Sequence, residues 1–147
     1  MTRSPSHMTT ISPAFLDWLA QQTAVVSHTI LIIEDEPLMR KIVADILRDV
    51  GFDVVTAASG EVGLAQYYEK VASIKLVLLD YTMPGINGEE AYHKLRKVNP
   101  DLKIILSSSY MDTATVRRFQ RESNVDILPK PYSLGALLQK ITQLVYY

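Results

Sequence analysis

The hydrophobic residues of this chain follow two alternating patterns from residue 29 onward. Short apolar runs rich in β-branched residues predict strands buried on both faces, and these runs cover residues 29–33, 53–57, 75–80, 102–107 and 125–128. Between them, apolar residues recur every three or four positions, which predicts amphipathic helices over residues 37–50, 60–72, 88–98, 112–122 and 134–145. Five strands alternating with five helices predict an α/β fold, a doubly wound parallel sheet covered on both faces.

Residues 1–28 have a different character. The stretch before Ser12 is polar, and we expect it to be partly disordered. Ser12 followed by Pro13 is typical of a helix start, so we expect a short helix over about residues 13–22. We therefore divide the chain into an N-terminal extension, residues 1–28, and a main domain, residues 29–147. The apolar face of the short helix either packs on the same domain, which is favoured, or anchors a partner.

Polar residues follow the carboxyl ends of several predicted strands. Glu34 and Asp35 follow the first strand, Asp80 ends the third, Ser108 follows the fourth, and Lys130 follows the fifth. Open α/β sheets bind ligands beyond the carboxyl ends of their strands, where the winding direction reverses. If the strand order is 2-1-3-4-5, this point lies between the first and third strands, and Glu34 and Asp35 would lie beside Asp80.

Clustered carboxylates need a counter-charge. Two of them about 5 Å apart repel by roughly 3 kcal/mol at an effective dielectric near 20, and without a counter-charge one of them takes up a proton. A few hard oxygen ligands suit Mg²⁺, and a lysine ammonium is suited to hold a phosphoryl oxygen. Asp80 with the two acids, Lys130 and the Ser108 hydroxyl therefore predicts a site for phosphoryl transfer to a carboxylate.

Composition and charge argue against several other functions. The chain of 147 residues is 48% hydrophobic and 21% charged, with a net charge of −1. The missing basic excess argues against a general nucleic-acid binder, and no apolar stretch approaches the length of a membrane span. Without cysteine there is no disulfide, thiolate metal site or cysteine nucleophile. The N-terminus lacks the apolar core of a signal peptide, so we expect a cytoplasmic location without membrane insertion.

Four segments resemble the receiver domain of two-component response regulators. They are Ile-Leu-Ile-Ile-Glu-Asp-Glu-Pro (30–37), Leu-Val-Leu-Leu-Asp-Tyr-Thr-Met-Pro-Gly-Ile-Asn-Gly (76–88), Ile-Ile-Leu-Ser-Ser (104–108) and Leu-Pro-Lys-Pro-Tyr (128–132). Each motif alone is a weak signal, whereas four in this order and spacing are a strong one. The resemblance covers about residues 29–146 and implies the flavodoxin-like strand order 2-1-3-4-5.

The resemblance also implies roles for the acidic residues. Asp80 matches the phosphoacceptor, which attacks a phosphohistidine and becomes an acyl phosphate. Asp35 matches the main acidic Mg²⁺ ligand, Glu34 is its neighbour and acts through water, and the backbone carbonyl of Thr82 supplies a further ligand. Glu34 replaces the aspartate that is commonest at its position. The longer side chain keeps its charge, so we expect metal binding to survive.

The resemblance assigns the phosphoryl contacts to Ser108 and Lys130. Ser108 matches the switch hydroxyl that turns inward to the phosphoryl oxygen, and Lys130 matches the lysine that pairs with it. The Lys130–Pro131 bond matches the family's usual cis peptide. Ile127 is the main departure, because the family usually carries a tyrosine or phenylalanine there. Isoleucine offers neither a hydroxyl nor a ring, so we expect a different readout.

The implied function is a signalling switch controlled by phosphorylation. A histidine kinase or a histidine phosphotransfer protein would donate the phosphoryl group, and an unidentified protein would bind the surface formed by the helix at 112–122, the strand at 125–128 and the last helix. Three arginines, Arg117, Arg118 and Arg121, lie on that helix. A homodimer is a further option. Such a domain catalyses its own phosphorylation and dephosphorylation, and is not an enzyme that turns over a separate substrate.

Other interpretations stay open at this point. A pseudo-receiver would keep the fold as a protein-binding module without phosphorylation, and Ile127 is its support. Phosphatases of the haloacid dehalogenase type also use a strand-end aspartate with Mg²⁺, but they need a second acid where this chain has Thr82. Residues 99–108 resemble receivers attached to hybrid histidine kinases, so the chain is either a single-domain regulator or a receiver from a larger protein.

Overall fold

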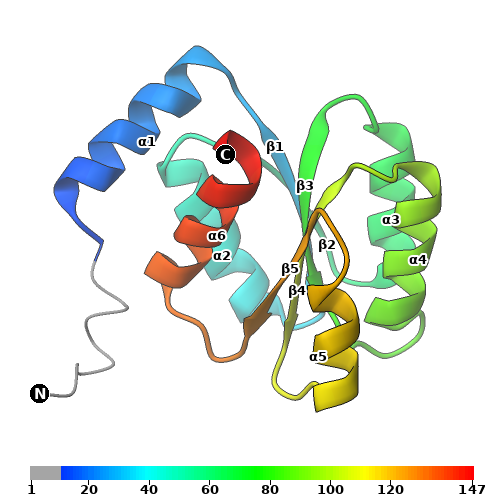
Figure 1. Ribbon diagram of the computed structural model, residues 1–147. Helices are drawn as coiled ribbons and strands as arrows, with labels where there is room; N and C mark the ends of the chain where they lie inside the picture. The colour runs from blue at the N-terminus through cyan, green and yellow to red at the C-terminus, as the bar shows by residue number, and fades with distance from the viewer. Residues whose placement is uncertain (1–10) are drawn as a thin grey trace, which may run out of the picture.

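The computed structural model describes residues 11–147 (Figure 1). The disorder expected before Ser12 falls almost wholly on residues 1–10, which lie outside the described residues. Five strands are present: β1 Thr29–Ile33, β2 Asp53–Ala57, β3 Ile74–Asp80, β4 Lys103–Ser108 and β5 Val125–Pro129. The helices between residues 11 and 147 are α1 Pro13–Val25, α2 Pro37–Asp49, α3 Gly60–Glu69, α4 Gly88–Val98, α5 Thr113–Gln120 and α6 Leu134–Tyr146.

The strands form one parallel sheet in the order β2-β1-β3-β4-β5. Helices α3, α4 and α5 cover one face, and α1, α2 and α6 lie on the other (Figure 1). The α/β doubly wound fold and its strand order are therefore confirmed. Of the six helices in the described part of the chain, five follow β1 as predicted, and the sixth is α1.

The short apolar runs form strands because each face of the sheet meets a helix layer. In β1, Leu31 and Ile33 point into the core beneath α3, α4 and α5, whereas Ile30 and Ile32 point into the core beneath α2 and α6. All four side chains are at most 1% exposed. A strand that is buried on both faces gains from apolar residues at every position, which explains the uninterrupted run.

Helix α3 is shorter than the predicted helix over residues 60–72. It ends at Glu69, because the Lys70 carbonyl accepts hydrogen bonds from the backbone N–H groups of Ser73 and Ile74 at 3.0 Å each. This turn reverses the chain and delivers it into β3 at Ile74. An apolar spacing alone does not reveal where such a turn interrupts a helix.

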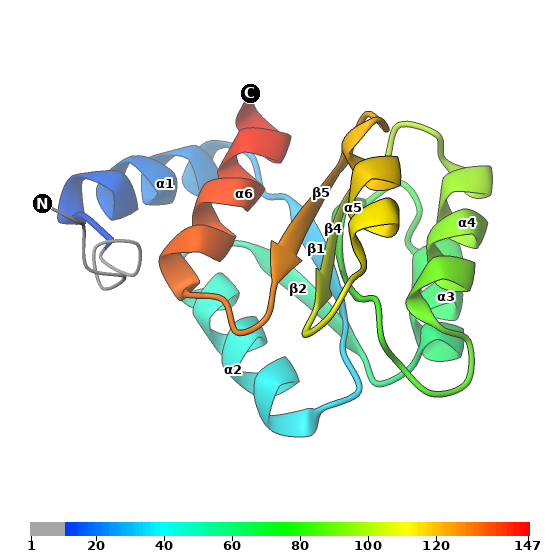
Figure 2. The same cartoon turned by 60° about the horizontal axis from the view of Figure 1, so that its bottom comes forward.

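Helix α1 packs on the domain and is longer than the predicted 13–22. Ser12 is its N-cap, and the Ser12 hydroxyl accepts a hydrogen bond from the Phe15 N–H at 3.0 Å. Leu19 is 0% exposed and belongs to the same core cluster as residues of α2 and α6. The ribbon of α1 runs beside that of α6 (Figure 2). The Trp18 ring lies edge-on to Tyr146 of α6, with centroids 5.7 Å apart. The division at residue 28 stays a prediction.

Gly51 allows α1 to approach the end of α2. Its φ of +107° lies in the region that favours glycine, and an added Cβ would come within 2.2 Å of the Thr23 hydroxyl oxygen. That hydroxyl donates a hydrogen bond to the Val50 carbonyl at 3.0 Å. Gly51, just beyond the end of α2, therefore makes room for α1. Among residues 11–147, no helix has the length and apolar character needed to cross a bilayer.

Substitution of Leu19 tests whether α1 is part of the cooperative fold. We expect Leu19→Ala to lower the free energy of unfolding in urea by about 2–5 kcal/mol, because it removes a fully buried side chain from a packed core. The matched control is Leu38→Ala on α2, where the leucine is 64% exposed and a change within about 0.5 kcal/mol is expected. Equal effects of the two substitutions would show that α1 contributes nothing to stability.

Candidate functional site

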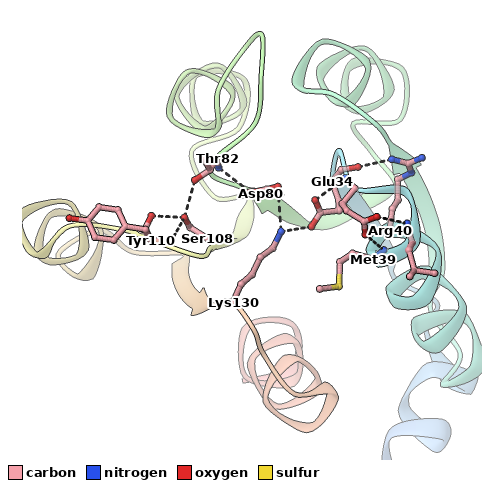
Figure 3. Close-up of polar contacts among 10 residues, drawn as sticks. Glu34, Met39, Arg40, Asp80, Thr82, Ser108, Tyr110 and Lys130 are labelled. Atoms are coloured by element: carbon pink, nitrogen blue, oxygen red, sulfur yellow. Dashed lines mark hydrogen bonds and ion pairs between the residues drawn. The ribbon is translucent and has the colours of Figure 1, made fainter.

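The parallel register brings the predicted site residues together at the carboxyl edge of the sheet (Figure 3). Glu34 and Asp35 directly follow β1, and Asp80 is the last residue of β3. Because β1 and β3 are neighbours, carboxylate oxygens of these three residues lie within 4.8 Å of one another. Lys130 directly follows β5 and reaches across the edge to this group.

The Lys130 ammonium links the two buried carboxylates. Its Nζ donates to Glu34 Oε1 at 2.6 Å and to Asp80 Oδ2 at 3.4 Å. Glu34 and Asp80 are 4% and 5% exposed, whereas Asp35 is exposed. Backbone N–H groups satisfy the remaining oxygens: that of Thr82 donates to Asp80 Oδ1 at 3.0 Å, and that of Glu36 donates to Glu34 Oε2 at 3.2 Å.

The pKa values of the site residues are shifted by burial and by the neighbouring charges. Burial raises the pKa of Asp80 to about 7, and the neighbouring Glu34 carboxylate adds to the shift. Burial lowers the pKa of Lys130, but the Glu34 and Asp80 carboxylates outweigh it, so the pKa is raised and the ammonium stays charged. Burial also raises the pKa of Tyr132 to about 12, with further contributions from Glu34 and Asp80. Tyr132 therefore remains protonated beside the site.

The charge of the cluster fits a divalent cation. Three carboxylates face one ammonium group, so two negative charges remain when all the acids are ionised. Burial is the main cause of the raised pKa of Asp80, and the Glu34 carboxylate raises it further against the opposing effect of Lys130. Oxygen ligands in this number, one of them exposed, suit Mg²⁺, which keeps several waters. Receiver domains as a family bind Mg²⁺ at such an acidic pocket, whereas a Thr82 carbonyl ligand here stays a prediction.

The Ser108 hydroxyl lies on the side of Asp80 opposite Glu34 (Figure 3). It donates to the Tyr110 carbonyl at 2.6 Å, accepts from the Tyr110 N–H at 3.1 Å, and lies 2.9 Å from the Thr82 hydroxyl. Ser108 is buried, with 4% exposure. Rotation toward a group on Asp80 would exchange the Tyr110 bonds for new ones, which is the requirement for a two-position switch.

Backbone contacts position Lys130 and Glu34. The Lys130 N–H donates to the Ser108 carbonyl at 2.8 Å, and the Lys130–Pro131 peptide is cis. Arg40 of α2 donates from Nη1 to the Glu34 carbonyl at 2.8 Å. Sequence reasoning missed Arg40 and the hydroxyl of Thr82, because neither belongs to a pattern that marks a site.

The Ile127 side chain is half-buried on the face of the sheet that carries α5. It packs against the core cluster beneath α3, α4 and α5. With Val116, Phe119 and Pro129 it lines a groove of about 300 Å³ between α5 and β5. Gln120, Asp126 and Lys140 line the same groove with polar side chains, whereas Ile127 brings no hydrogen-bonding group to this part of the surface.

Comparison with known proteins identifies relatives of this chain. The model of the response regulator receiver domain family matches residues 30–142. The sensor kinase CckA of Brucella abortus is 33% identical over 119 residues, which are 81% of this chain and 13% of that kinase. The chemotaxis protein CheY of Bacillus subtilis is 30% identical over 117 residues, which are 80% of this chain and 97% of CheY.

Two solved receiver or response-regulator structures are also similar to this chain. The receiver domain of the hybrid histidine kinase CckA is 32% identical, with a TM-score of 0.69, over 80% of this chain and 98% of that domain. The response regulator TrrA of Thermotoga maritima, in complex with Mg²⁺ and BeF, is 30% identical, with a TM-score of 0.70, over 80% of this chain and 99% of that one. The chain spans only 13% and 30% of CckA and of a Thermotoga maritima cyclic di-GMP phosphodiesterase.

The raised pKa of Asp80 predicts how stability depends on pH. The folded protein holds this proton up to about pH 7, whereas an aspartate with the ordinary pKa of 3.8 loses it earlier. The stabilising contribution of the proton is therefore complete below about pH 4 and is lost as the pH rises to about 7. In EDTA, we expect the native protein to lose roughly 2–4 kcal/mol relative to Asp80→Asn across this range, measured by urea unfolding.

Two controls sharpen this measurement. Asp101→Asn changes an exposed aspartate away from the site and should follow the native pH dependence. Added Mg²⁺ should reduce the loss for the native protein, because a cation favours the ionised carboxylate, and should leave Asp80→Asn unchanged. A difference between native protein and Asp80→Asn that does not vary with pH would mean that Asp80 titrates in its ordinary range.

Proposed function

We propose that this chain, which belongs to the response regulator receiver domain family of two-component signalling, accepts a phosphoryl group on Asp80 and acts as a switch. The observation that carries this proposal is the placement of one buried carboxylate between a lysine and two further acids. Asp80 Oδ2 lies 3.4 Å from the Lys130 ammonium, and Glu34 and Asp35 lie within 4.8 Å of it.

In the proposed reaction, an Asp80 oxygen attacks the phosphorus of a phosphohistidine. The new O–P bond forms as the P–N bond breaks, and the electron pair returns to the imidazole nitrogen, whose ring leaves neutral when its other nitrogen carries a proton. The Lys130 ammonium balances charge on a phosphoryl oxygen, and its contact with Asp80 places it there. A Mg²⁺ held by Glu34, Asp35 and Asp80 supplies further charge neutralisation when bound.

Hydrolysis resets the switch. A water oxygen attacks the phosphorus of the acyl phosphate and the bond from phosphorus to the Asp80 oxygen breaks. The Asp80 carboxylate is restored, and inorganic phosphate leaves with the oxygen of the water, whose protons pass to phosphate and solvent. Lys130 then returns to its contacts with Glu34 and Asp80. The chain thus acts on its own side chain, and no separate substrate is turned over.

The proposed donor is a histidine kinase or a histidine phosphotransfer protein. Two apolar side chains of α2 lie exposed one turn apart, Leu38 at 64% and Ile42 at 46%. They follow the acidic residues closely in the chain, so a donor bound to them would hold its phosphohistidine near Asp80. The relationship to the receiver part of sensor kinase CckA supports this class of partner. We place the switch in the cytoplasm, where such a donor would be phosphorylated.

A pseudo-receiver that binds partners without phosphorylation is the alternative. Ile127 favours it, since an isoleucine in the groove between α5 and β5 cannot itself report on Asp80 through a hydrogen bond, although Gln120, Asp126 and Lys140 also line that groove. The buried charges oppose it. Burial of the Asp80 carboxylate lowers the stability of the fold, and a neutral residue at this position would remove that penalty. A protein that only binds partners would gain nothing from keeping the carboxylate.

Intact-protein mass after incubation with Mg²⁺ and a small-molecule phosphodonor tests the proposal. We expect one phosphoryl adduct on the native chain and none on Asp80→Asn. Lys130→Met should lower the rate of adduct formation about tenfold or more, because it removes the positive charge next to the acceptor. Asp101→Asn, at an exposed position, should behave as the native chain does.

Failure of this experiment has a clear meaning. If the native chain forms no adduct with any of several phosphodonors, the phosphorylation proposal is wrong and the pseudo-receiver is favoured. If an adduct forms equally on Asp80→Asn, the acceptor has been misassigned. Chelation of Mg²⁺ with EDTA should abolish adduct formation, and an unchanged rate in EDTA would contradict the assigned metal requirement.

A further inference from the structure

We propose that Tyr81, Glu89 and Arg118 form a latch that ties α5 to α4 in the unphosphorylated protein and opens when Asp80 is phosphorylated. In this scheme the three residues are positioning residues for the switch, and the latch carries the signal from Asp80 to α5. The inference rests on the proposed function of Asp80.

Tyr81 is tied to both the site and α4. It directly follows Asp80, and its backbone N–H donates to the Ser107 carbonyl of β4 at 2.8 Å. Its hydroxyl donates to Glu89 Oε2 in the first turn of α4 at 3.1 Å. One side chain therefore joins the phosphoacceptor strand to a helix whose surface is exposed.

The same carboxylate holds α5. Arg118 Nη1 lies 2.7 Å from Glu89 Oε1, whereas Tyr81 holds Oε2. His93, one turn further along α4, also faces Glu89 Oε1, with its Nε2 at 3.6 Å. The Arg118 guanidinium also lies over the ring of Phe119, 4.6 Å from its centroid, and that ring contacts Tyr81 edge-on at 5.8 Å. Although partial burial raises it, the pKa of Glu89 is lowered by Arg118 and Tyr81, so the carboxylate stays ionised.

Movement of the Ser108 hydroxyl would change the contact between Arg118 and Glu89. The Ser108 hydroxyl is bonded to the carbonyl and the N–H of Tyr110, and the chain reaches Asp112, the N-cap of α5, shortly afterwards. If the hydroxyl turns to a phosphoryl oxygen on Asp80, those bonds break and the loop that leads into α5 shifts. Arg118 moves with α5, whereas Glu89 stays with α4, so the pair between them is the contact that must break or slide.

Among the described residues, no ion pair ties the opposite side of α5 to its neighbours. The groove between α5 and β5 is lined partly by Gln120, Asp126 and Lys140, but Asp126 pairs with Lys140 of α6 and not with α5. The apolar groups of Val116, Ile127 and Pro129, which also line it, pack without a preferred direction. A contact of this kind changes gradually when a helix shifts, whereas an ion pair with one bonded arrangement is either made or lost. The directional contacts that hold α5 to the rest of the site are therefore on the side of α4.

The latch is weak enough to open. The side chains of Arg118 and Glu89 are 44% and 40% exposed, and ion pairs with such exposure change an equilibrium by a factor of about two to five. A link of that size biases the unphosphorylated arrangement without locking it. Its loss should therefore shift the population toward the switched state by the same factor.

Affinity for beryllofluoride, a phosphoryl analogue, measures this shift. In Mg²⁺, we expect Arg118→Gln and Glu89→Gln each to bind beryllofluoride about two- to fivefold more tightly than the native protein. The double variant should bind no more tightly than either single variant, because both changes break the same contact. Arg117→Gln is the matched control on the same helix, exposed and likewise positively charged before substitution, and should leave the affinity unchanged.

A second readout separates the latch from a general loss of charge. In Tyr81→Phe only the hydroxyl is removed, so the ring contact with Phe119 remains. This variant should unfold at nearly the same urea concentration as the native protein. It should speed amide hydrogen exchange in α5 by about two- to fivefold without beryllofluoride. With beryllofluoride bound, α5 of the native protein and of the variant should exchange at equal rates.

The outcomes are distinguishable. A native protein that binds no beryllofluoride overturns the proposed function and the latch together. Binding by the native protein with variants that match Arg117→Gln overturns the latch and leaves the proposed function intact. Weaker binding by Arg118→Gln and Glu89→Gln also overturns the latch, since it would place the ion pair in the switched state.

Discussion

The carboxyl edge of the sheet depends on the balance between three carboxylates and one ammonium group. Lys130 comes from the end of β5, 96 residues after Glu34, and its backbone N–H is bonded to the Ser108 carbonyl. Its Nζ can reach both buried acids only if β1, β3, β4 and β5 lie in this order. The charge balance therefore requires the whole sheet, and the sheet positions a carboxylate that would otherwise be too costly to bury.

The amino edge of the sheet carries stabilising contacts, whereas the carboxyl edge carries the acidic site. At the amino edge, the Arg96 guanidinium donates to the Leu102 carbonyl at 2.6 Å, the Pro100 carbonyl at 2.9 Å and the Asn124 carbonyl at 3.3 Å, and so closes the loops that precede β4 and β5. At the carboxyl edge, Asp80 keeps a raised pKa. Stabilising contacts at one edge and the apolar cores offset a charge arrangement at the other that is suited to chemistry rather than to stability.

Much of the fold and site could be predicted from local patterns. The strands agree to within one residue at each end, because runs that are buried on both faces contain apolar residues at every position. Asp80 and Lys130 could be predicted because they stand at strand ends. Leu38 and Ile42 share the apolar spacing of α2, yet they are 64% and 46% exposed. Periodicity assigns a face to a side chain but does not say how far the neighbouring layer extends.

Contacts between side chains that are distant in sequence could not be predicted, for a different reason. The hydroxyls of Thr82 and Ser108 meet across 26 residues, and no local pattern encodes such a pair. The readout depends on contacts of this kind, since a switch needs groups with two alternative partners. Ser108 has Tyr110 as one partner and a phosphorylated Asp80 as the proposed other. Ile127 makes only apolar packing contacts itself, and such contacts change little when a helix shifts, so the discriminating bonds have to lie elsewhere around α5.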